Sequence, residues 1–424
     1  MAKPEIRLKG FEGEWDRESF TNVFRFLKNN SLSRADLNYE NGKISNVHYG
    51  DVLIKFGEIL DVDHSTLPYI TNSEIADRLD KDNFLQNGDI VFADAAEDNT
   101  VGKCSEIQGM RLTDKVVSGL HTIPCRPIRQ FEKGYLGYFL NSNSYHDQLL
   151  PMIQGTKVCG ISKSNLNLTT ISYPNNIDEQ IALADYFRSL DSMLQSTTKK
   201  IKSLKQMKQA CIVSMFPQAG ETTPRVRFKG FEGEWEKKLL SDCLDISNER
   251  NLDNKYSKED VLSVSDDFGV MNQIELLGRS YAGKSVSNYG VLKHGALVYT
   301  KSPLKSKPFG IVKENTGETG IVSVLYAIYR AKEGYWIPYF HYFFDPAWRL
   351  NAYLRPLINK GAKNTMNISD ETALTGYIMV PKDIKEQQRI ASFFRSLDKQ
   401  ISLQEKRLEK LKQIKAACLD KMFV

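Results

Sequence analysis

The chain contains the same framework twice, and this duplication constrains its fold more than any other feature. Residues 179–191 and 386–398 share the pattern Glu-Gln-x-x-[Ile/Leu]-Ala-x-aromatic-Phe-Arg-Ser-Leu-Asp. The two copies stay aligned without a gap over the longer ranges 174–216 and 381–423. Such a repeat indicates two equivalent structural halves within one chain.

A second shared pattern opens each half. Residues 9–15 and residues 229–235 both read Lys-Gly-Phe-Glu-Gly-Glu-Trp, and their apolar side chains should dock this segment onto the body that follows. The sequences between the shared blocks have little in common. A constant framework with divergent filling is typical of one scaffold that carries two different recognition surfaces.

Composition sets the broad class. The 424 residues are long enough for two or more domains, and 41% hydrophobic with 26% charged residues is ordinary for a globular protein. The formal charge of +5 permits a nucleic-acid partner without requiring one. No apolar run is long enough to span a bilayer and no signal peptide opens the chain, so we expect a cytoplasmic protein. The 6 cysteines are scattered, which predicts neither disulfides nor a metal site.

Each shared block predicts a long helix. Apolar residues recur at alternating steps of four and three from Leu183 to Met215 and from Ile390 to Met422, with no Gly or Pro between them. Each helix should contain about 35–40 residues and extend about 55 Å.

The two helices interrupt their apolar seams at matching positions, which are Thr197 and Lys208 in the first and Gln404 and Lys415 in the second. Buried polar seam positions fix the register of paired helices. We therefore expect the helices to face each other within one chain, with a homodimeric coiled coil as the alternative.

The fold class predicted is α+β. It consists of two globular α/β bodies, each followed by a long helix, with the helices paired as an antiparallel coiled coil in a pseudo-twofold repeat. The expected boundaries are 1–174 for the first body, 175–216 for its helix, 217–224 for a linker, 225–380 for the second body and 381–424 for its helix. Within the bodies we expect strands at 47–54, 85–92 and 292–299, and aromatic helical stretches at 135–149 and 335–354 that belong to the core.

One catalytic-looking motif is present. Residues 278–285 satisfy G-x-x-x-x-G-K-[ST], the phosphate-binding pattern of nucleotide-binding proteins. That pattern needs a buried strand before it and a helix after it, and residues 286–290 do not resemble a helix start. A loop that contacts DNA is the other interpretation. We find no other catalytic constellation, and no catalytic or metal-binding residues are expected in this chain.

The repeated helix pattern and the repeated opening pattern resemble those of specificity subunits of type I restriction–modification systems, over the whole length. The resemblance implies that each body is a target-recognition domain that reads one half of a split DNA sequence, while the helices set the gap. It also implies two modification subunits that use S-adenosylmethionine and restriction subunits that use ATP and magnesium, with no cofactor in this chain. Four residues of the repeated helix pattern are the expected docking positions for partners: Arg188, Asp191, Arg395 and Asp398.

Double-stranded DNA would then be held through phosphate contacts and read through base edges. Candidate contacts are chosen by residue type and loop position, because divergent loops carry no readable code. In the first body they are Lys103, Lys157, Ser162, Lys163 and Asn165. In the second body they are Arg279, Tyr281, Lys284, Ser285, Lys301, Lys305, Lys307, Lys360, Lys363 and Asn364.

Two other classes of function stay open at this point. The chain could be a nucleotide-dependent enzyme built around residues 278–285, or a coiled-coil scaffold without a DNA role. ATP binding would favour the first, and DNA affinity that hardly responds to salt would favour the second.

Overall fold

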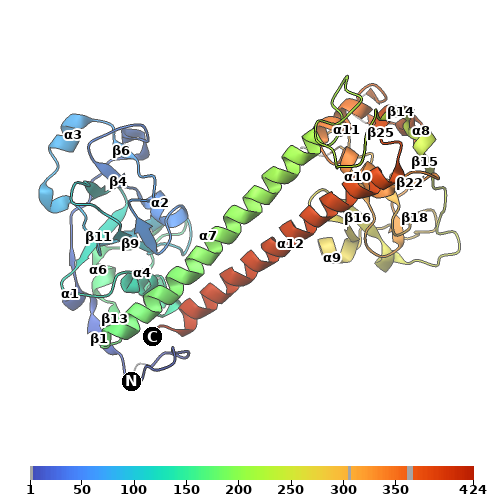
Figure 1. Ribbon diagram of the computed structural model, residues 1–424. Helices are drawn as coiled ribbons and strands as arrows, with labels where there is room; N and C mark the ends of the chain where they lie inside the picture. The colour runs from blue at the N-terminus through green and yellow to red at the C-terminus, as the bar shows by residue number, and fades with distance from the viewer. Residues whose placement is uncertain (1–2, 304–306, 361–365) are drawn as a thin grey trace. The chain divides into compact units, whose positions relative to one another are not determined.

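The shared blocks form the two long helices of the chain, α7 (Ile177–Ser214) and α12 (Ile384–Lys421), each of 38 residues. The computed structural model describes residues 3–303, 307–360 and 366–424. Figure 1 shows α7 in green and α12 in red. Glu179 and Glu386 lie in the first turns, where a negative charge is favourable against the helix dipole. The predicted mixed α and β chain, with one long helix in the middle and one at the C-terminus, is confirmed.

The chain divides into two compact units. Unit 1 comprises Met1–Thr198 and Lys406–Val424, whereas unit 2 comprises Lys199–Glu405. Each unit therefore contains one body, the first part of the helix that follows that body, and the last part of the other long helix. The body of unit 1 is completed by the C-terminal end of the chain.

The body of unit 1 is built on a five-stranded sheet of order β2-β11-β7-β9-β5. Its strands are β2 (Phe24–Phe26), β11 (Thr122–Pro127), β7 (Ile90–Ala93), β9 (Cys104–Gln108) and β5 (Ile59–Asp61). A four-stranded sheet contains β10 (Val116–Ser118), β4 (Ser45–Val47), β6 (Tyr69–Ile70) and β3 (Leu37–Asn38) in that order. Two short sheets pair β1 (Asp16–Ser19) with β13 (Thr170–Tyr173), and β8 (Ala95–Ala96) with β12 (Cys159–Gly160). The central strand β7 is buried at every position, as a continuous apolar run predicts.

Two helices of the aromatic stretch connect this sheet to the long helix. They are α4 (Tyr135–Leu140) and α5 (Asn143–Leu149). Every residue of α4 is buried, and its aromatic rings share one core with Phe187 of α7 and Phe423 near the C-terminus. The expectation that these aromatics belong to the core is confirmed. The other helices of the body are α1 (Phe20–Val23), α2 (Tyr49–Ile54), α3 (Ser73–Asp77) and α6 (Lys163–Asn167).

Unit 2 has its own set of sheets and helices. Its main sheet has the order β15-β22-β19-β20, made of β15 (Leu244–Ile246), β22 (Ala327–Ala331), β19 (Leu297–Tyr299) and β20 (Val312–Glu314). Paired strands are β14 (Glu236–Leu239) with β25 (Tyr377–Val380), β16 (Leu262–Ser265) with β17 (Gly269–Asn272), β18 (Gly290–Leu292) with β21 (Gly320–Val322), and β23 (Asn359–Lys360) with β24 (Met366–Asn367). The helices are α8 (Leu240–Cys243), α9 (Gln273–Leu277), α10 (Ile337–Phe344) and α11 (Ala347–Leu354).

The strand predicted over residues 47–54 is wrong. β4 ends at Val47, and the helix α2 begins at Tyr49. The ring of His48 accepts the amide of Gly50 at 3.2 Å, which caps the helix, and Asp51 pairs with Arg34 at 2.9 Å. Capping and a tertiary ion pair therefore outweigh the β-propensity of the Val and Ile side chains.

Candidate functional site

The shared opening segment is attached to the long helix by a buried ion pair. In unit 1, the guanidinium of Arg7 donates to both carboxylate oxygens of Glu179 at 2.7 Å, and it also donates to the carbonyl of Gly13 at 2.6 Å. The indole of Trp15 donates to the same carboxylate at 3.3 Å. Glu179 is 2% exposed, so this fork geometry satisfies a carboxylate that is withdrawn from water.

Unit 2 contains the same attachment. Arg227 donates to the two carboxylate oxygens of Glu386 at 2.7 and 2.8 Å, and to the carbonyl of Gly233 at 2.6 Å. The neighbouring Trp235 is buried as well. The first glutamate of the repeated helix pattern therefore holds the opening segment, which explains why both patterns occur twice.

The glutamine that follows each glutamate joins the helix to its body. Gln180 accepts the amide of Glu132 at 3.0 Å and donates to the carbonyl of Pro174 at 2.9 Å. Gln387 accepts the amide of Trp336 at 3.0 Å and donates to the carbonyl of Pro381 at 3.2 Å. The Glu-Gln start of each long helix thus fixes its direction relative to its own body.

A partly buried lysine joins both long helices to the body in unit 1. The ammonium of Lys415 on α12 lies 2.6 Å from Asp191 on α7 and 2.6 Å from Glu58, while Tyr138 donates its hydroxyl to Asp191 at 2.8 Å. Burial disfavours the charged ammonium, but the two carboxylates outweigh it and raise the pKa of Lys415. We name these four residues the unit 1 lysine cluster.

Unit 2 carries the equivalent unit 2 lysine cluster, Lys208, Asp345, Asp398 and Tyr342. Lys208 on α7 lies 2.8 Å from Asp398 on α12 and 3.5 Å from Asp345, and Tyr342 donates to Asp398 at 2.9 Å. Burial acts against ionisation here too, yet the carboxylates raise the pKa of Lys208. At the polar seam positions, Lys208 and Lys415 therefore each bind one carboxylate of the other long helix and one of the body.

An aromatic residue at the end of each long helix enters the other body. Phe423 packs against Trp15, Tyr135, Phe139 and Phe187 in unit 1. In the same way, Phe216 packs against Trp235, Tyr339, Phe343 and Phe394 in unit 2. The two aromatic sites use the same residue types at every one of these positions.

The four residues predicted to dock partners make internal contacts. Asp191 and Asp398 belong to the lysine clusters. Arg188 pairs with Asp185 at 2.6 Å and donates to the carbonyl of Lys133, and Arg395 pairs with Glu314. Their charges hold the long helices onto the bodies, and their role in docking stays a prediction.

The candidate DNA-contacting residues of the first body lie on neighbouring segments. Lys103, Lys157 and Lys163 are exposed, and Lys163 lies over the ring of Phe26. Ser162 and Asn165 form a capping box at the start of α6, so both side chains are used locally. The amide of Ile161 donates to the carbonyl of Asp94 at 3.0 Å, which brings the 155–163 loop beside the segment that leads to Lys103.

In the second body, residues 278–285 form a loop between α9 and β18. The element before the loop is a short helix and the element after it is a strand, the reverse of a nucleotide-binding loop. Tyr281 is 60% exposed, with the guanidinium of Arg279 stacked 4.6 Å from its ring centroid. Lys284 and Ser285 are exposed beside them. The loop therefore exposes cationic, aromatic and hydroxyl groups, and its contact with DNA stays a prediction.

The basic stretch 301–308 is less available than the sequence indicates. Lys301 pairs with Asp370 at 2.5 Å, and Lys307 is buried against Asp266 at 2.6 Å. Lys305, Lys363 and Asn364 lie outside the described residues. Lys360 ends β23, and its side chain lies outside the described part of the structure.

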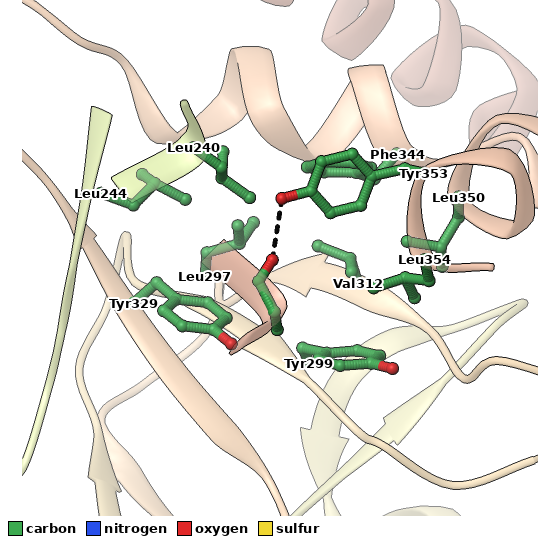
Figure 2. Close-up of a pocket in the computed structure, with 11 residues that line it drawn as sticks. Leu240, Leu244, Leu297, Tyr299, Val312, Tyr329, Phe344, Leu350, Tyr353 and Leu354 are labelled. Atoms are coloured by element: carbon green, nitrogen blue, oxygen red, sulfur yellow. Dashed lines mark hydrogen bonds between the residues drawn. The ribbon is translucent and has the colours of Figure 1, made fainter. Parts of the chain in front are cut away.

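Figure 2 shows an internal cavity in unit 2. Its volume is about 20 Å³, and apolar side chains such as Leu297, Val312 and Leu354 line it. The hydroxyl of Tyr353 is already bound to the carbonyl of Ala373 at 2.8 Å. That volume is roughly the space of one water molecule, so the cavity has no room for a nucleotide.

A larger hollow of about 320 Å³ lies on unit 1, between residues 86–89 and 126–133. Its buried charges have partners in the protein. Asp89 and Arg126 share two hydrogen bonds of 2.7 Å, and Glu106 accepts amides from Gly134 and Gly137 at 2.6 and 2.9 Å. Burial raises the pKa of Glu106, with these amides acting in the opposite direction. Among the described residues, no cluster of metal-binding side chains occurs, and no helix is long and apolar enough to cross a bilayer.

Several residues of these sites were not found from the sequence. Arg7 and Arg227 each lie two residues before the shared opening pattern of their half. Tyr138 and Tyr342 belong to a Tyr-x-x-Tyr-Phe spacing that is present in each half, so the sequence contained a signal for all four residues. Glu58 and Asp345, which complete the lysine clusters, lie in divergent parts of the bodies. A third such residue, Arg349, is buried and donates to the carbonyl of Ile212 at 2.9 Å.

Comparison with known proteins places the architecture. No protein-family model and no curated protein matches the sequence. The type I restriction–modification system S subunit from M. genitalium aligns with a TM-score of 0.58 at 13% identity, over 100% of this chain and 99% of that chain. The chain has the S-subunit fold.

A second solved structure supports this assignment. It is described as the structural basis of complex assembly and conformational transition of the type I restriction–modification system, and it aligns with a TM-score of 0.51 at 14% identity. The alignment covers 96% of this chain and 97% of that chain. Because both alignments run over nearly the whole chain, both bodies and both long helices have counterparts in the S-subunit fold.

Proposed function

We propose that this chain is the specificity subunit of a type I restriction–modification complex, and that it contributes DNA recognition without catalysis of its own. The observation that carries this proposal is the S-subunit fold over the full length of the chain. The Arg–Glu pair, the Glu-Gln helix start and the Lys–Asp–Tyr contacts that hold each helix recur in both units, whereas the exposed loops of the two bodies differ. Two different loop sets on one framework suit a bipartite target, with one half read by each body.

The helices supply the second part of the proposal. In unit 1, Tyr186 contacts Cys418 and Asp191 contacts Lys415, so residue numbers rise along α7 while they fall along α12. In unit 2, Lys205 pairs with Glu405 and Lys208 with Asp398, in the same sense. These contacts support an antiparallel coiled coil with pseudo-twofold repetition that sets the gap between the half-sites.

The partners follow from the same proposal. Two modification subunits would dock on the two similar faces of the helices and methylate adenine with S-adenosylmethionine, after flipping the base out of the duplex. Restriction subunits would add translocation and cleavage with ATP and magnesium. This chain would hold phosphates through exposed residues such as Lys157, Lys163 and Lys284, and read base edges through its loops.

A domain exchange tests the proposal. The full chain is produced with modification subunits, and the methylated adenines are mapped across a genome. Residues 16–173 are then replaced by the corresponding body of another chain with the S-subunit fold. We expect a split methylated sequence in which only one half changes after the exchange. Changes in both halves, or no split sequence at all, would contradict the proposal.

Salt dependence separates this proposal from a scaffold without a DNA role. The assembled complex should bind duplex DNA with an affinity whose logarithm falls steeply and linearly with the logarithm of the salt concentration. Replacing Lys157, Lys163 and Lys284 with Gln should reduce that slope. A flat response for the unaltered complex would favour the scaffold.

A further inference from the structure

The two lysine clusters divide the long helices in the same way. Asp191 and Lys208 stand 17 positions apart on α7 (191 to 208), and Asp398 and Lys415 stand 17 positions apart on α12 (398 to 415). The two ion-paired residues of each helix are therefore about 25 Å apart along its axis, at ~1.5 Å per residue. In each unit the aspartate of one helix meets the lysine of the other.

The apolar seam alone does not define this register. Its residues repeat every heptad, so a slip of seven residues would still place apolar side chains opposite one another. The same slip would move Lys415 from Asp191 to Ala184 or Thr198, neither of which carries a carboxylate. A buried ammonium without a counter-charge is strongly unfavourable, so the lysine distinguishes one register from the next.

Each cluster also reaches beyond the helices to the body. Glu58 comes directly before β5 and binds Lys415, while Asp345 directly follows α10 and binds Lys208. One side chain thus fixes helix to helix and helix to body at the same point.

We propose that Lys415 and Lys208 are positioning residues for the gap in the DNA target, because they fix the point at which each long helix is held in each unit. This inference rests on the proposed function. It assigns the gap to two ion-paired clusters in addition to the length of the helices.

The two clusters differ in how many cations bind their carboxylates, so removing Lys415 and removing Lys208 should have effects of different size. In unit 2, Asp345 is also bound by Lys313 at 2.7 Å, and Lys313 shares Asp266 with Lys307. The unit 2 cluster therefore keeps a cation on Asp345 when Lys208 is removed. In unit 1, Lys415 is the cation that joins Glu58 and Asp191, so its loss should have the larger effect.

The test uses the full chain with its modification subunits, with methylated adenines mapped genome-wide. The unaltered complex should give a single gap length. Lys415→Met should give neighbouring gap lengths as well, Lys208→Met should give fewer of them, and Lys415→Arg should restore the single gap. A single gap with Lys415→Met at unaltered methylation would overturn the inference.

A second variant covers the case in which Lys415→Met fails to assemble. The neutral variant with Glu58→Gln, Asp191→Asn and Lys415→Met removes the ion pairs without leaving a buried charge. It too should broaden the gap, and a single gap with this variant overturns the inference.

Hydrogen exchange on the isolated full chain provides a readout that does not need DNA. Lys415→Met and the neutral variant should speed amide exchange at the end of α12 and around β5, and leave β7 protected. Unchanged exchange at both places would also overturn the inference. Absence of any split sequence with the unaltered complex would refute the proposed function instead, and the exchange result would still decide the role of the cluster.

Discussion

Several charged side chains of this protein act as internal attachments. Glu179, Glu386, Lys208 and Lys415 are buried, or nearly so, and each is bound by oppositely charged groups with short contacts. Removing Arg7 or Arg227 should cost about 3–5 kcal/mol, because the partner glutamate would stay charged in a site withdrawn from water. Asp191 and Asp398, which the sequence suggests as docking residues, therefore also have a structural role. A mutational study of docking must distinguish a loss of partner contact from a loss of this internal attachment.

His341 gives unit 2 a pH dependence. Desolvation is the main cause that lowers its pKa to about 3, with Lys313, Lys208 and Arg395 acting in the same direction and Asp345 against it. The ring nitrogen Nδ1 faces the amide of Glu314 at 3.4 Å, consistent with a neutral acceptor. The unfolded chain binds the proton near pH 6.5, whereas the folded chain binds it only near pH 3, so stability should fall as the pH drops from about 6.5 to about 3.

The measurement is the free energy of unfolding of unit 2 by urea at several pH values. His341→Asn should reduce the acid slope by at most about 1.4 kcal/mol per pH unit, the value for one proton. His294→Asn, at an exposed position of the same unit, is the matched control. Equal slopes for the His341 variant and the unaltered chain would contradict this assignment.

At the scale of elements, a glycine in α4 sets how closely this helix approaches β5 and β9 in unit 1. A Cβ added at Gly137 in α4 would lie 2.4 Å from the carbonyl oxygen of Glu58 and 3.0 Å from Glu106. The glycine is therefore required by close approach to the segment that carries Glu58. The matching position in α10 is His341, so the two units differ in the size of the side chain at this position of the aromatic helix.

Gly137→Ala should destabilise unit 1 although alanine favours helices. Overpacking against a backbone atom typically costs about 1–3 kcal/mol. Gly57→Ala, which introduces a methyl group into open space in the same unit, should change the unfolding free energy by less than about 0.5 kcal/mol. Urea unfolding of the two variants provides the comparison, and equal stabilities would show that α4 can move away from the sheet.

The long helices were predictable because their pattern is local. A heptad seam without Gly or Pro, acidic first turns and a second copy in the same chain all indicate the same element. The strand expected over residues 47–54 failed because His48 and Asp51 make contacts that a propensity argument does not contain. Within the site, Lys208 and Lys415 were recognised as polar seam positions. Their partners Glu58 and Asp345 could not be predicted, because they come close only in the folded chain and no sequence pattern links them to the lysines.

At the scale of the molecule, unit 1 depends on the end of the chain. Phe423 fills the aromatic site formed by Trp15, Tyr135, Phe139 and Phe187, and the amide of Ile6 donates to the carbonyl of Lys421 at 2.9 Å. Phe216 provides the same packing in unit 2 from within the chain. The core of each body thus includes the end of a helix that its own segment of sequence does not supply.

Removing residues 422–424 should therefore destabilise the body at the opposite end of the sequence. Loss of a buried phenylalanine costs about 3–5 kcal/mol. Hydrogen exchange should show lost protection at β7 of unit 1 and unchanged protection at β19 of unit 2, whereas Phe216→Ala should produce the reverse. If the deletion lowered amide protection at both β7 and β19, the two units would not unfold independently, and the prediction would be wrong.

The contact between Phe423 and Trp15 also has a consequence for biosynthesis. The body that leaves the ribosome first lacks one of its core residues until Phe423 has been synthesised, so its apolar site stays open while the whole second body is made. Nascent chains on one messenger would carry this open site for most of their synthesis, and quality control by chaperones would act on the N-terminal body first.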